Sequence, residues 1–397
     1  MIYEPREDSI LLEKQVSKLA LGRVLDLGTG SGIQALTLIK SPYVREVVAA
    51  DISKGAIEKL NEQIKKQRLR KIKVLHSDLF EQVRGQFNTI IFNPPYLPQD
   101  KNIQDEAIYG GKKGWEISGR FFRQASRYLF PEGKIIFLFS SLTNKDKINE
   151  IIAHNLFEHQ ELDKQKLPFE ELYVYEIKKT LLLRELEGKG LENVRYFSRG
   201  KRGLIYKAAF DQNKMIKSHL AQKKIIAVAV KVKNEQSAAE GTVENEVKWL
   251  KLLNKYHLGP FFLFSGKNYF VCQFIEGEFI MKWIEKNTKD KIILLLKNIL
   301  QQCYVLDTFK VTKEEMHHPQ KHIIIDSNNT PVFLDFERCT ETPKPKNVTQ
   351  FLEFLCRIKE ILKKKAILIA PQEIRNIAKA YKLNYDKRLL NEIFDKK

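Results

Sequence analysis

The chain has 397 residues, which is enough for two domains of ordinary size. Hydrophobic residues make up 43% and aromatic residues 10%, and this content excludes a wholly disordered chain. The formal net charge of +19 permits a weak contact with an acidic partner such as RNA, although lysines are spread along the whole chain.

The cysteine and hydropathy patterns argue against several classes of protein. The four cysteines lie far apart and form no C-x-x-C pair, so neither a zinc site nor a disulfide framework is expected. The opening MIYEPREDSI is polar and acidic, so no signal peptide is expected. No apolar run approaches the roughly 18 residues that a membrane helix needs. We therefore expect a soluble, cytoplasmic protein without membrane contact.

A glycine-rich turn follows the first predicted strand. Residues 23–32 read RVLDLGTGSG, in which Asp26 ends the strand and three glycines open the next helix: Gly28, Gly30 and Gly32. Glycines at such a turn let the backbone pass close to a ligand. The following strand, EVVAAD, ends in Asp51, whose carboxylate can accept hydrogen bonds from ribose hydroxyls in a Rossmann-like unit.

A second candidate site is the sequence IIFNPPYLP, residues 90–98. Proline lacks an N–H and disfavours the helical region for the residue before it, so the strand stops at Asn93. The Asn93 side chain and the Pro94 carbonyl then offer two acceptors and one donor where open α/β sheets bind ligands. This set suits a planar –NH2 group beside a carbonyl or ring nitrogen, with Tyr96 on its flat face. A proline-stiffened turn without a ligand is the alternative.

In order and spacing, these segments resemble the class I S-adenosylmethionine-dependent methyltransferases. More narrowly, they resemble the HemK-type glutamine methyltransferases of archaea and eukaryotes that modify translation release factors. The resemblance covers roughly residues 2–179 and rests on YEPREDSILL, DLGTGSG, AADIS, SDLF, NPPYLP, GGKKGWEISGRFF and PEGKIIFLFSSL. The NPPY segment by itself would not distinguish a glutamine from an adenine substrate.

The resemblance implies S-adenosylmethionine as cofactor and a role for each matched residue. To the cofactor it assigns Pro5, Asp8, Asp26, Gly28, Gly30, Gly32, Asp51 and Asp78, and to the substrate amide Asn93, Pro94, Pro95 and Tyr96. Asp26 would lie at the methionine part, Asp51 at the ribose and Asp78 near the adenine. Asp8 could instead cap a helix that begins near Ser9. Asp26 could be a buried hydrogen-bonding partner of the glycine loop.

The second half of the chain has a different pattern. A glycine turn between strands, the strand IIAVAVKVK, the helix VENEVKWLKLLNKY and the segment FLDFE follow one another. This order resembles a small protein-kinase-like fold of the RIO type, and more closely an archaeal group of predicted serine/threonine kinases, over roughly residues 190–345. The resemblance implies ATP and Mg²⁺ bound by Gly200, Gly203, Lys231, Glu246 and Asp335, with Asp335 as the metal ligand.

The catalytic loop departs from the kinase pattern. Where kinases have H-R-D-x-x-x-x-N, residues 315–322 read EMHHPQKH, without an Asp at the base position. His317 or His318 could accept a proton instead. His322 falls where the metal-binding Asn belongs, and imidazole is a poorer Mg²⁺ ligand than oxygen. An active kinase and a nucleotide-binding pseudokinase stay open, and a transition-metal site lacks a fourth ligand.

We therefore predict an α/β chain with a Rossmann-like class I methyltransferase domain over residues 1–180. A smaller α+β protein-kinase-like domain with a helical C-terminal tail follows over residues 181–397. The predicted substrate is a glutamine side chain of a translation release factor, and a small zinc-binding activator is a predicted partner. The alternatives are an N6-adenine methyltransferase acting on DNA or RNA, and a translation-associated binding protein with a pseudokinase half.

Overall fold

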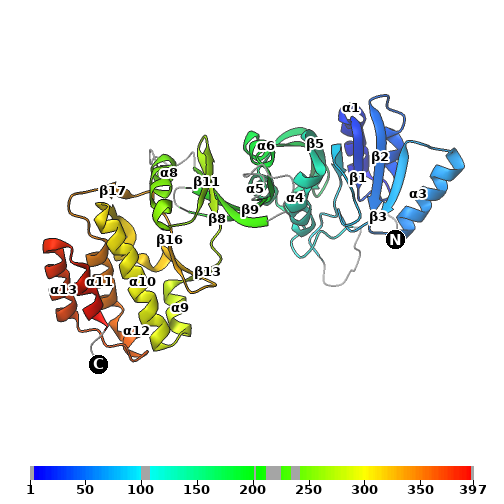
Figure 1. Cartoon of the computed structure of the whole chain (residues 1–397). Coiled ribbons are helices and arrows are strands. Elements are labelled where there is room, and N and C mark those ends of the chain that lie inside the picture. The colour runs from blue at the N-terminus through cyan, green and yellow to red at the C-terminus, as the bar shows by residue number, and fades with distance from the viewer. Residues whose placement is uncertain (1–3, 100–107, 201–202, 212–224, 234–241, 395–397) are drawn as a thin grey trace. The chain divides into compact units, whose positions relative to one another are not determined.

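The computed structural model describes residues 4–99, 108–200, 203–211, 225–233 and 242–394 (Figure 1). Tyr3 of the opening motif and residues 201–202 of the predicted glycine turn lie outside the described residues. The chain divides into two compact units, Met1–Tyr196 with Ala208–Ile225 and Phe197–Lys207 with Ile226–Lys397. Within the described ranges, no helix is both long enough and apolar enough to span a membrane.

The first unit alternates strands with helices. Its elements are α1 (Glu7–Leu19), β1 (Gly22–Leu27), α2 (Ile33–Leu38), β2 (Val44–Asp51), α3 (Lys54–Gln67), β3 (Ile72–His76), β4 (Phe87–Phe92), α4 (Glu116–Tyr128), β5 (Leu129–Ser140), α5 (Lys145–His154), β6 (Phe157–Lys166), β7 (Glu171–Lys179) and α6 (Leu181–Gly188). Among the described residues, seven strands form one sheet in the order β3-β2-β1-β4-β5-β7-β6.

The sheet is parallel except at β7. Strand β1 pairs in parallel with both β2 and β4, and β7 runs antiparallel to its neighbours β5 and β6. Strands β1 and β4 are therefore adjacent in the sheet although they are not consecutive in the chain. In open α/β sheets, ligands bind at the carboxyl ends of strands at such a point.

Both faces of this sheet are buried because successive strand residues point to opposite sides. On one face, Leu12 of α1 and Leu60 of α3 pack in a core with Ile91 of β4. On the other face, Phe92 stacks on Phe121 of α4 with ring centroids 4.4 Å apart. Helices cover both faces, so the ends of the strands are the places left for a site.

The second half of the chain begins with a separate sheet. Its strands are β8 (Leu191–Arg199), β9 (Gly203–Asp211), β10 (Ile225–Lys233), β11 (Phe262–Gly266) and β12 (Tyr269–Gln273), in the order β11-β12-β10-β9-β8. Helix α8 (Thr242–Leu253) follows β10 along the chain. Strand β12 runs antiparallel to both β10 and β11.

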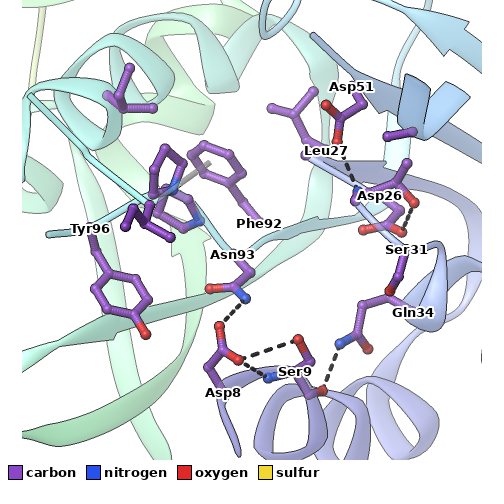
Figure 2. Close-up of a pocket in the computed structure, with 18 of the residues that line it drawn as sticks. Asp8, Ser9, Asp26, Leu27, Ser31, Gln34, Asp51, Phe92, Asn93 and Tyr96 are labelled. Atoms are coloured by element: carbon purple, nitrogen blue, oxygen red, sulfur yellow. Dashed lines mark hydrogen bonds between the residues drawn. The ribbon is translucent and has the colours of Figure 1, made fainter. Parts of the chain in front are cut away.

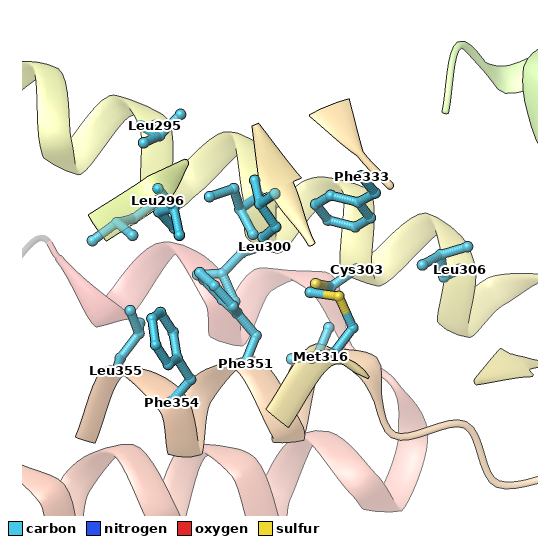
Figure 3. Close-up of a cluster of buried hydrophobic side chains, with 14 of the residues drawn as sticks. Leu295, Leu296, Leu300, Cys303, Leu306, Met316, Phe333, Phe351, Phe354 and Leu355 are labelled. Atoms are coloured by element: carbon cyan, nitrogen blue, oxygen red, sulfur yellow. The ribbon is translucent and has the colours of Figure 1, made fainter. Parts of the chain in front are cut away.

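Helices dominate the rest of the second unit. The elements are β13 (Gly277–Phe279), α9 (Ile280–Lys286), α10 (Lys289–Thr308), β14 (Val311–Lys313), β15 (Ile323–Asp326), β16 (Pro331–Phe333), β17 (Cys339–Glu341), α11 (Asn347–Arg357), α12 (Lys359–Lys363) and α13 (Pro371–Asn384). Leucines of α10 and phenylalanines of α11 share one core (Figure 3). Four apolar residues of the C-terminal segment are buried in the same core: Phe351, Leu355, Ile358 and Leu362.

The four cysteines lie in the second unit and are buried, free thiols. Burial raises the pKa of Cys272 and of Cys339 to about 12.

Candidate functional site

A cavity of about 1000 Å³ lies in the first unit at the carboxyl ends of β1, β2 and β4. The glycine loop after β1 and the Asn93–Tyr96 segment after β4 both form parts of its wall. The two segments meet because β1 and β4 pair in parallel, with Leu27 beside Phe92. Strand pairing therefore brings the two motifs of the sequence into one site.

The glycine loop requires glycine at defined positions. Gly28 and Gly32 have φ values of +67° and +81°, in the left-handed region that L side chains rarely adopt. A Cβ on Gly32 would lie 2.6 Å from Cδ1 of the buried Leu60. The loop can turn sharply into α2 only because these side chains are absent.

Gly32→Ala should lower the free energy of unfolding by about 1–3 kcal/mol, because it combines backbone strain with a contact too short for a Cβ. Urea denaturation measures the change. Gly188→Ala is the matched control, since its added Cβ would meet nothing within 4 Å and its φ is not positive. Equal stability of the Gly32 and Gly188 variants would contradict the strain assigned to Gly32.

Asp26 is buried beneath the glycine loop, with 2% of its surface exposed. Its Oδ2 accepts hydrogen bonds from Thr29 Oγ1 at 2.6 Å and from the Ala35 backbone N–H at 3.2 Å. Burial, reinforced by the charge of Asp51, raises the pKa of Asp26 to about 6, despite the opposing effect of the two bonds. Asp26 therefore both fixes the loop, as one alternative held, and lines the cavity.

Asp26→Asn should raise the free energy of unfolding at pH 7.5 by about 1–3 kcal/mol, because the folded chain no longer holds a buried charge. The pKa of Asp26 is raised from 3.8 to about 6, so the folded state binds more protons than the unfolded state between these values. Its contribution to wild-type stability is therefore largest below pH 4 and is lost as pH rises through 6. Urea denaturation of both proteins should show a gain at pH 7.5 that shrinks near pH 4; a constant difference would contradict the assigned pKa.

Two further carboxylates line the cavity after β2 and β3. Asp51 accepts hydrogen bonds from the backbone N–H groups of Gly30 and Ser53, each at 2.8 Å. Asp78 forms an ion pair with Arg120 of α4, with Nη2 and Oδ2 2.7 Å apart. The carboxylates thus stand at successive strand ends along one wall, as expected for recognition of an extended ligand with several polar groups.

The two polar atoms of the Asn93 side chain differ in their hydrogen bonding. Its Nδ2 donates to Asp8 Oδ2 at 2.8 Å (Figure 2). Its Oδ1 is buried and has no hydrogen-bond partner among the described residues. A buried acceptor without a partner costs free energy unless a ligand satisfies it, so this atom marks a place for a donor.

The structure places almost every predicted residue of the first unit in the cavity wall. Pro5 and Gly32 are the exceptions: Pro5 is exposed before α1, and Gly32 lies at the start of α2. The capping alternative for Asp8 is wrong, because α1 begins at Glu7 and its N-cap position is Arg6. Gln34 and Arg120 also line the cavity and were not assigned a role, although Gln34 follows the segment DLGTGSG and Arg120 lies within the segment GGKKGWEISGRFF.

The family model described as "Methyltransferase small domain" matches residues 7–169. A putative protein N5-glutamine methyltransferase of Methanocaldococcus jannaschii is 38% identical over 179 residues, which make up 44% of this chain and 89% of that protein. The chain belongs to the methyltransferase small-domain family. This result confirms the Rossmann-like methyltransferase expected for the first part of the chain.

A bacterial relative and a solved structure are also similar to this chain. A release factor glutamine methyltransferase of Borreliella burgdorferi is 33% identical over 147 residues, 33% of this chain and 51% of that protein. The chain thus spans about half the length of this bacterial relative. The solved E. cuniculi Mtq2–Trm112 complex, described as responsible for methylation of the eRF1 translation termination factor, is 25% identical, with a TM-score of 0.37 over 45% of this chain and 99% of that chain.

A second polar cluster lies in the second unit, beyond the residues that match the methyltransferase family. Lys231 of β10 places its Nζ 2.5 Å from Glu246 Oε2 of α8 and 2.8 Å from Asp335 Oδ1. Glu337 Oε2 lies 3.5 Å from the same ammonium. Burial opposes ionisation, but the three carboxylates outweigh it and raise the pKa of Lys231 above its ordinary value. The lysine is therefore charged and held by carboxylates at neutral pH.

The surroundings of Asp335 are also polar. Lys313 is fully buried and donates to the backbone carbonyl of Asp335 and to Glu315 Oε2. Burial would raise the pKa of Asp335, but the charge of Lys231 lowers it below the ordinary value. His322 Nδ1 lies 3.5 Å from Asp335 Oδ2, and burial together with Lys313 lowers the pKa of this histidine. Asp335 is thus an ionised carboxylate, and the imidazole beside it is neutral.

Of the other predicted positions of the nucleotide site, Gly203 begins β9 beside Lys231, since a Cβ on Gly203 would lie 3.9 Å from Lys231 Cγ. The Gly200 N–H donates to the Gly203 carbonyl at 2.9 Å. A Cβ on Gly203 would lie 2.6 Å from the Val232 carbonyl oxygen, so glycine allows β9 to approach β10 closely. His317 and His318 are exposed, and His318 faces Arg357. Partial desolvation, followed by the charge of Arg357, lowers the pKa of His318.

Proposed function

We propose that the methyltransferase unit transfers a methyl group from S-adenosylmethionine to the side-chain amide nitrogen of a glutamine in a translation release factor. The observation that carries this proposal is the buried Asn93 Oδ1 at the wall of the cavity, an acceptor to which no described residue donates. The names of the relatives support the glutamine over other substrates: a putative protein N5-glutamine methyltransferase and a release factor glutamine methyltransferase.

The residues of the cavity fit S-adenosylmethionine. The cofactor supplies a methyl group on a positively charged sulfur, which is already strongly electrophilic. The methionine part also carries an ammonium group, which needs acceptors. Gln34 Oε1 is buried at the cavity without a partner among the described residues, and Asp26 ionises near pH 6. The Asp51 carboxylate can accept from ribose hydroxyls, as in Rossmann-like units.

The residues at the end of β4 would position the nucleophile. An amide nitrogen is a poor nucleophile because its lone pair is delocalised into the carbonyl. Asn93 Oδ1 and the Pro94 carbonyl can accept the two amide hydrogens and hold the nitrogen in line with the methyl group. The same fixed dipoles stabilise the positive charge that develops on the nitrogen. No general base is required at the transfer step, because the product proton is acidic.

An exocyclic adenine amine would present the same two hydrogens to the same acceptors, so N6-adenine methylation is the rival reaction. Incubation of the full chain with labelled S-adenosylmethionine and with release factor, tRNA or DNA separates the two. We expect label in the release factor, at the glutamine side chain. Label in nucleic acid alone would overturn the glutamine proposal.

The resemblance also leads us to propose a small zinc-binding activator that adds to an edge of the sheet. The edges of the described seven-stranded sheet are β3 and β6. Transfer rates measured with and without such a protein, added to the full chain, test this partner. Full activity of the chain alone would remove the need for it.

For the second unit, we propose a kinase-like fold that binds ATP with Mg²⁺. The observation that favours it is the Lys231 ammonium, held 2.5 Å from Glu246 and 2.8 Å from Asp335. Lysine supplies a positive charge for phosphates, and an ionised Asp335 offers the hard oxygen ligand that Mg²⁺ prefers. Slow phosphoryl transfer is expected, because no residue at the base position resembles the usual Asp. Any transfer should depend on His317 or His318.

A further inference from the structure

A partly buried hydrogen bond joins the first helix to the residue that follows strand β4. Asp8 of α1 has 4% of its surface exposed, and its Oδ2 accepts from Asn93 Nδ2 at 2.8 Å. Its other oxygen, Oδ1, accepts from the Ser9 backbone N–H at 2.7 Å and from Ser9 Oγ at 3.3 Å. Both oxygens of the carboxylate are therefore fixed, one by its own helix and one by the substrate-binding segment.

The chemistry of this pair sets the orientation of the Asn93 amide. An ionised carboxylate only accepts hydrogen bonds, whereas an amide has a donor side and an acceptor side of nearly the same shape. Facing Asp8, Asn93 must turn its NH2 group toward the carboxylate. Its oxygen is then left on the side of Tyr96, as Figure 2 shows, where it is buried without a partner among the described residues.

A second hydrogen bond anchors Asp8 to the glycine loop. The Ser9 carbonyl accepts from Gln34 Nε2 at 2.8 Å, and Gln34 lies in the first turn of α2, directly after the loop. Ser9 and Gln34 are 4% and 5% exposed, so water competes little for these bonds. The series Gln34–Ser9–Asp8–Asn93 therefore connects the helix after the glycine loop to the segment that would hold the substrate.

We infer that Asp8 is a positioning residue that holds the Asn93 oxygen toward the substrate, so that the site selects an –NH2 group and rejects a carboxylate. This inference rests on the proposed glutamine methylation and deepens it, because it explains how the site distinguishes glutamine from glutamate. The two side chains have nearly the same shape and differ in whether they donate or only accept. Two fixed acceptors, Asn93 Oδ1 and the Pro94 carbonyl, favour the –NH2 group of glutamine and repel the carboxylate of glutamate.

The test is Asp8→Asn in the full chain. The new amide can donate to Asn93 Oδ1, which allows the Asn93 amide to reverse and present its NH2 group instead. Binding of two peptides with the release factor sequence is measured, one with the substrate glutamine and one with glutamate in its place. The wild type should prefer glutamine by at least about a hundredfold, and D8N by less than about tenfold, as expected when the donor and acceptor of the partly buried Asp8–Asn93 hydrogen bond can exchange places.

Two controls test whether a changed preference in D8N comes from the substitution type in general or from weaker cofactor binding. Asp146→Asn makes the same substitution at an exposed position of α5 and should keep the wild-type preference. The dissociation constant for S-adenosylmethionine should change less than about threefold in D8N. If D8N does not fold, Asp8→Ser replaces it, because a hydroxyl also donates as well as accepts.

Each outcome decides between the proposals. A wild-type chain that neither binds nor methylates the glutamine peptide overturns both the glutamine function and this inference. A wild-type chain that methylates the peptide, together with a D8N variant that keeps the full preference for glutamine over glutamate, overturns the inference alone. Loss of cofactor affinity in D8N with an unchanged preference would make Asp8 a cofactor ligand and also overturn the inference.

Discussion

Asn93→Ala is expected to lower kcat for methyl transfer by about a hundredfold or more, while the affinity for S-adenosylmethionine stays nearly unchanged. The variant removes the acceptor Oδ1, which is buried at the cavity and has no partner among the described residues. Loss of one preorganised acceptor affects the transition state, where the nitrogen becomes positive, more than it affects cofactor binding. Single-turnover transfer of labelled methyl and calorimetric titration of the cofactor measure the two quantities.

A matched variant tests whether the loss is specific to the site. Asn61→Ala changes a half-buried asparagine of α3 that does not line the cavity. Its kcat should equal that of the wild type. If instead the cofactor affinity collapsed in Asn93→Ala, Asn93 would belong to the cofactor site and its assigned role would be wrong.

Lys231→Ala and Asp335→Ala should each abolish binding of ATP with Mg²⁺ to the full chain. Lys231 is charged at neutral pH because the surrounding carboxylates raise its pKa, and Asp335 stays ionised because Lys231 lowers its pKa. Removing the lysine takes away the charge for the phosphates and leaves buried carboxylates that repel them. Removing Asp335 takes away the oxygen ligand for the metal. Equilibrium dialysis with labelled ATP measures the binding directly.

Lys282→Ala is the control for a change of charge alone, because this lysine of α9 is exposed and lies 3.8 Å from Glu278. It should bind ATP as the wild type does. Absence of ATP and GTP binding by the wild type at millimolar concentration would refute the nucleotide proposal for the second unit. Binding that survives in Lys231→Ala would place the nucleotide elsewhere.

The sequence predicts those parts of the site that consist of consecutive residues in one turn. The glycine loop and the Asn93–Tyr96 segment are each continuous, and each follows an apolar strand that the pattern predicts. Parallel pairing of β1 and β4 then brings the segments together without further information. The methyltransferase fold and most of the cavity wall were therefore predictable.

Contacts between distant side chains were not predictable in the same way. The Asp8–Asn93 hydrogen bond joins residues 85 positions apart, and the Asp78–Arg120 pair joins residues 42 positions apart. Neither periodicity nor a local motif indicates which rotamers will meet across such separations. The capping alternative for Asp8 considered only the local helix, whereas Asp8 also accepts a hydrogen bond from Asn93, which directly follows β4.

In the second unit, too, some residues of the polar cluster were predicted and others were not. The order of Lys231, Glu246 and Asp335 predicted one polar cluster, and the structure brings their charged atoms into contact. The involvement of Glu337 and of the fully buried Lys313 was not predicted. Lysine in a polar stretch of sequence is usually exposed, so its burial beneath Asp335 had no local signal.

The positions of the cysteines allow local unfolding of the second unit to be measured by thiol modification. All four thiols are buried in the second unit, and the first unit has none. A thiol reacts as its thiolate and only when reagent reaches it, so the buried groups with raised pKa should be silent until their surroundings open. The rate of modification by a thiol reagent would then follow opening of the second unit alone, even in the intact chain. Nucleotide that binds there should slow this rate, while a ligand confined to the cavity of the first unit should leave it unchanged.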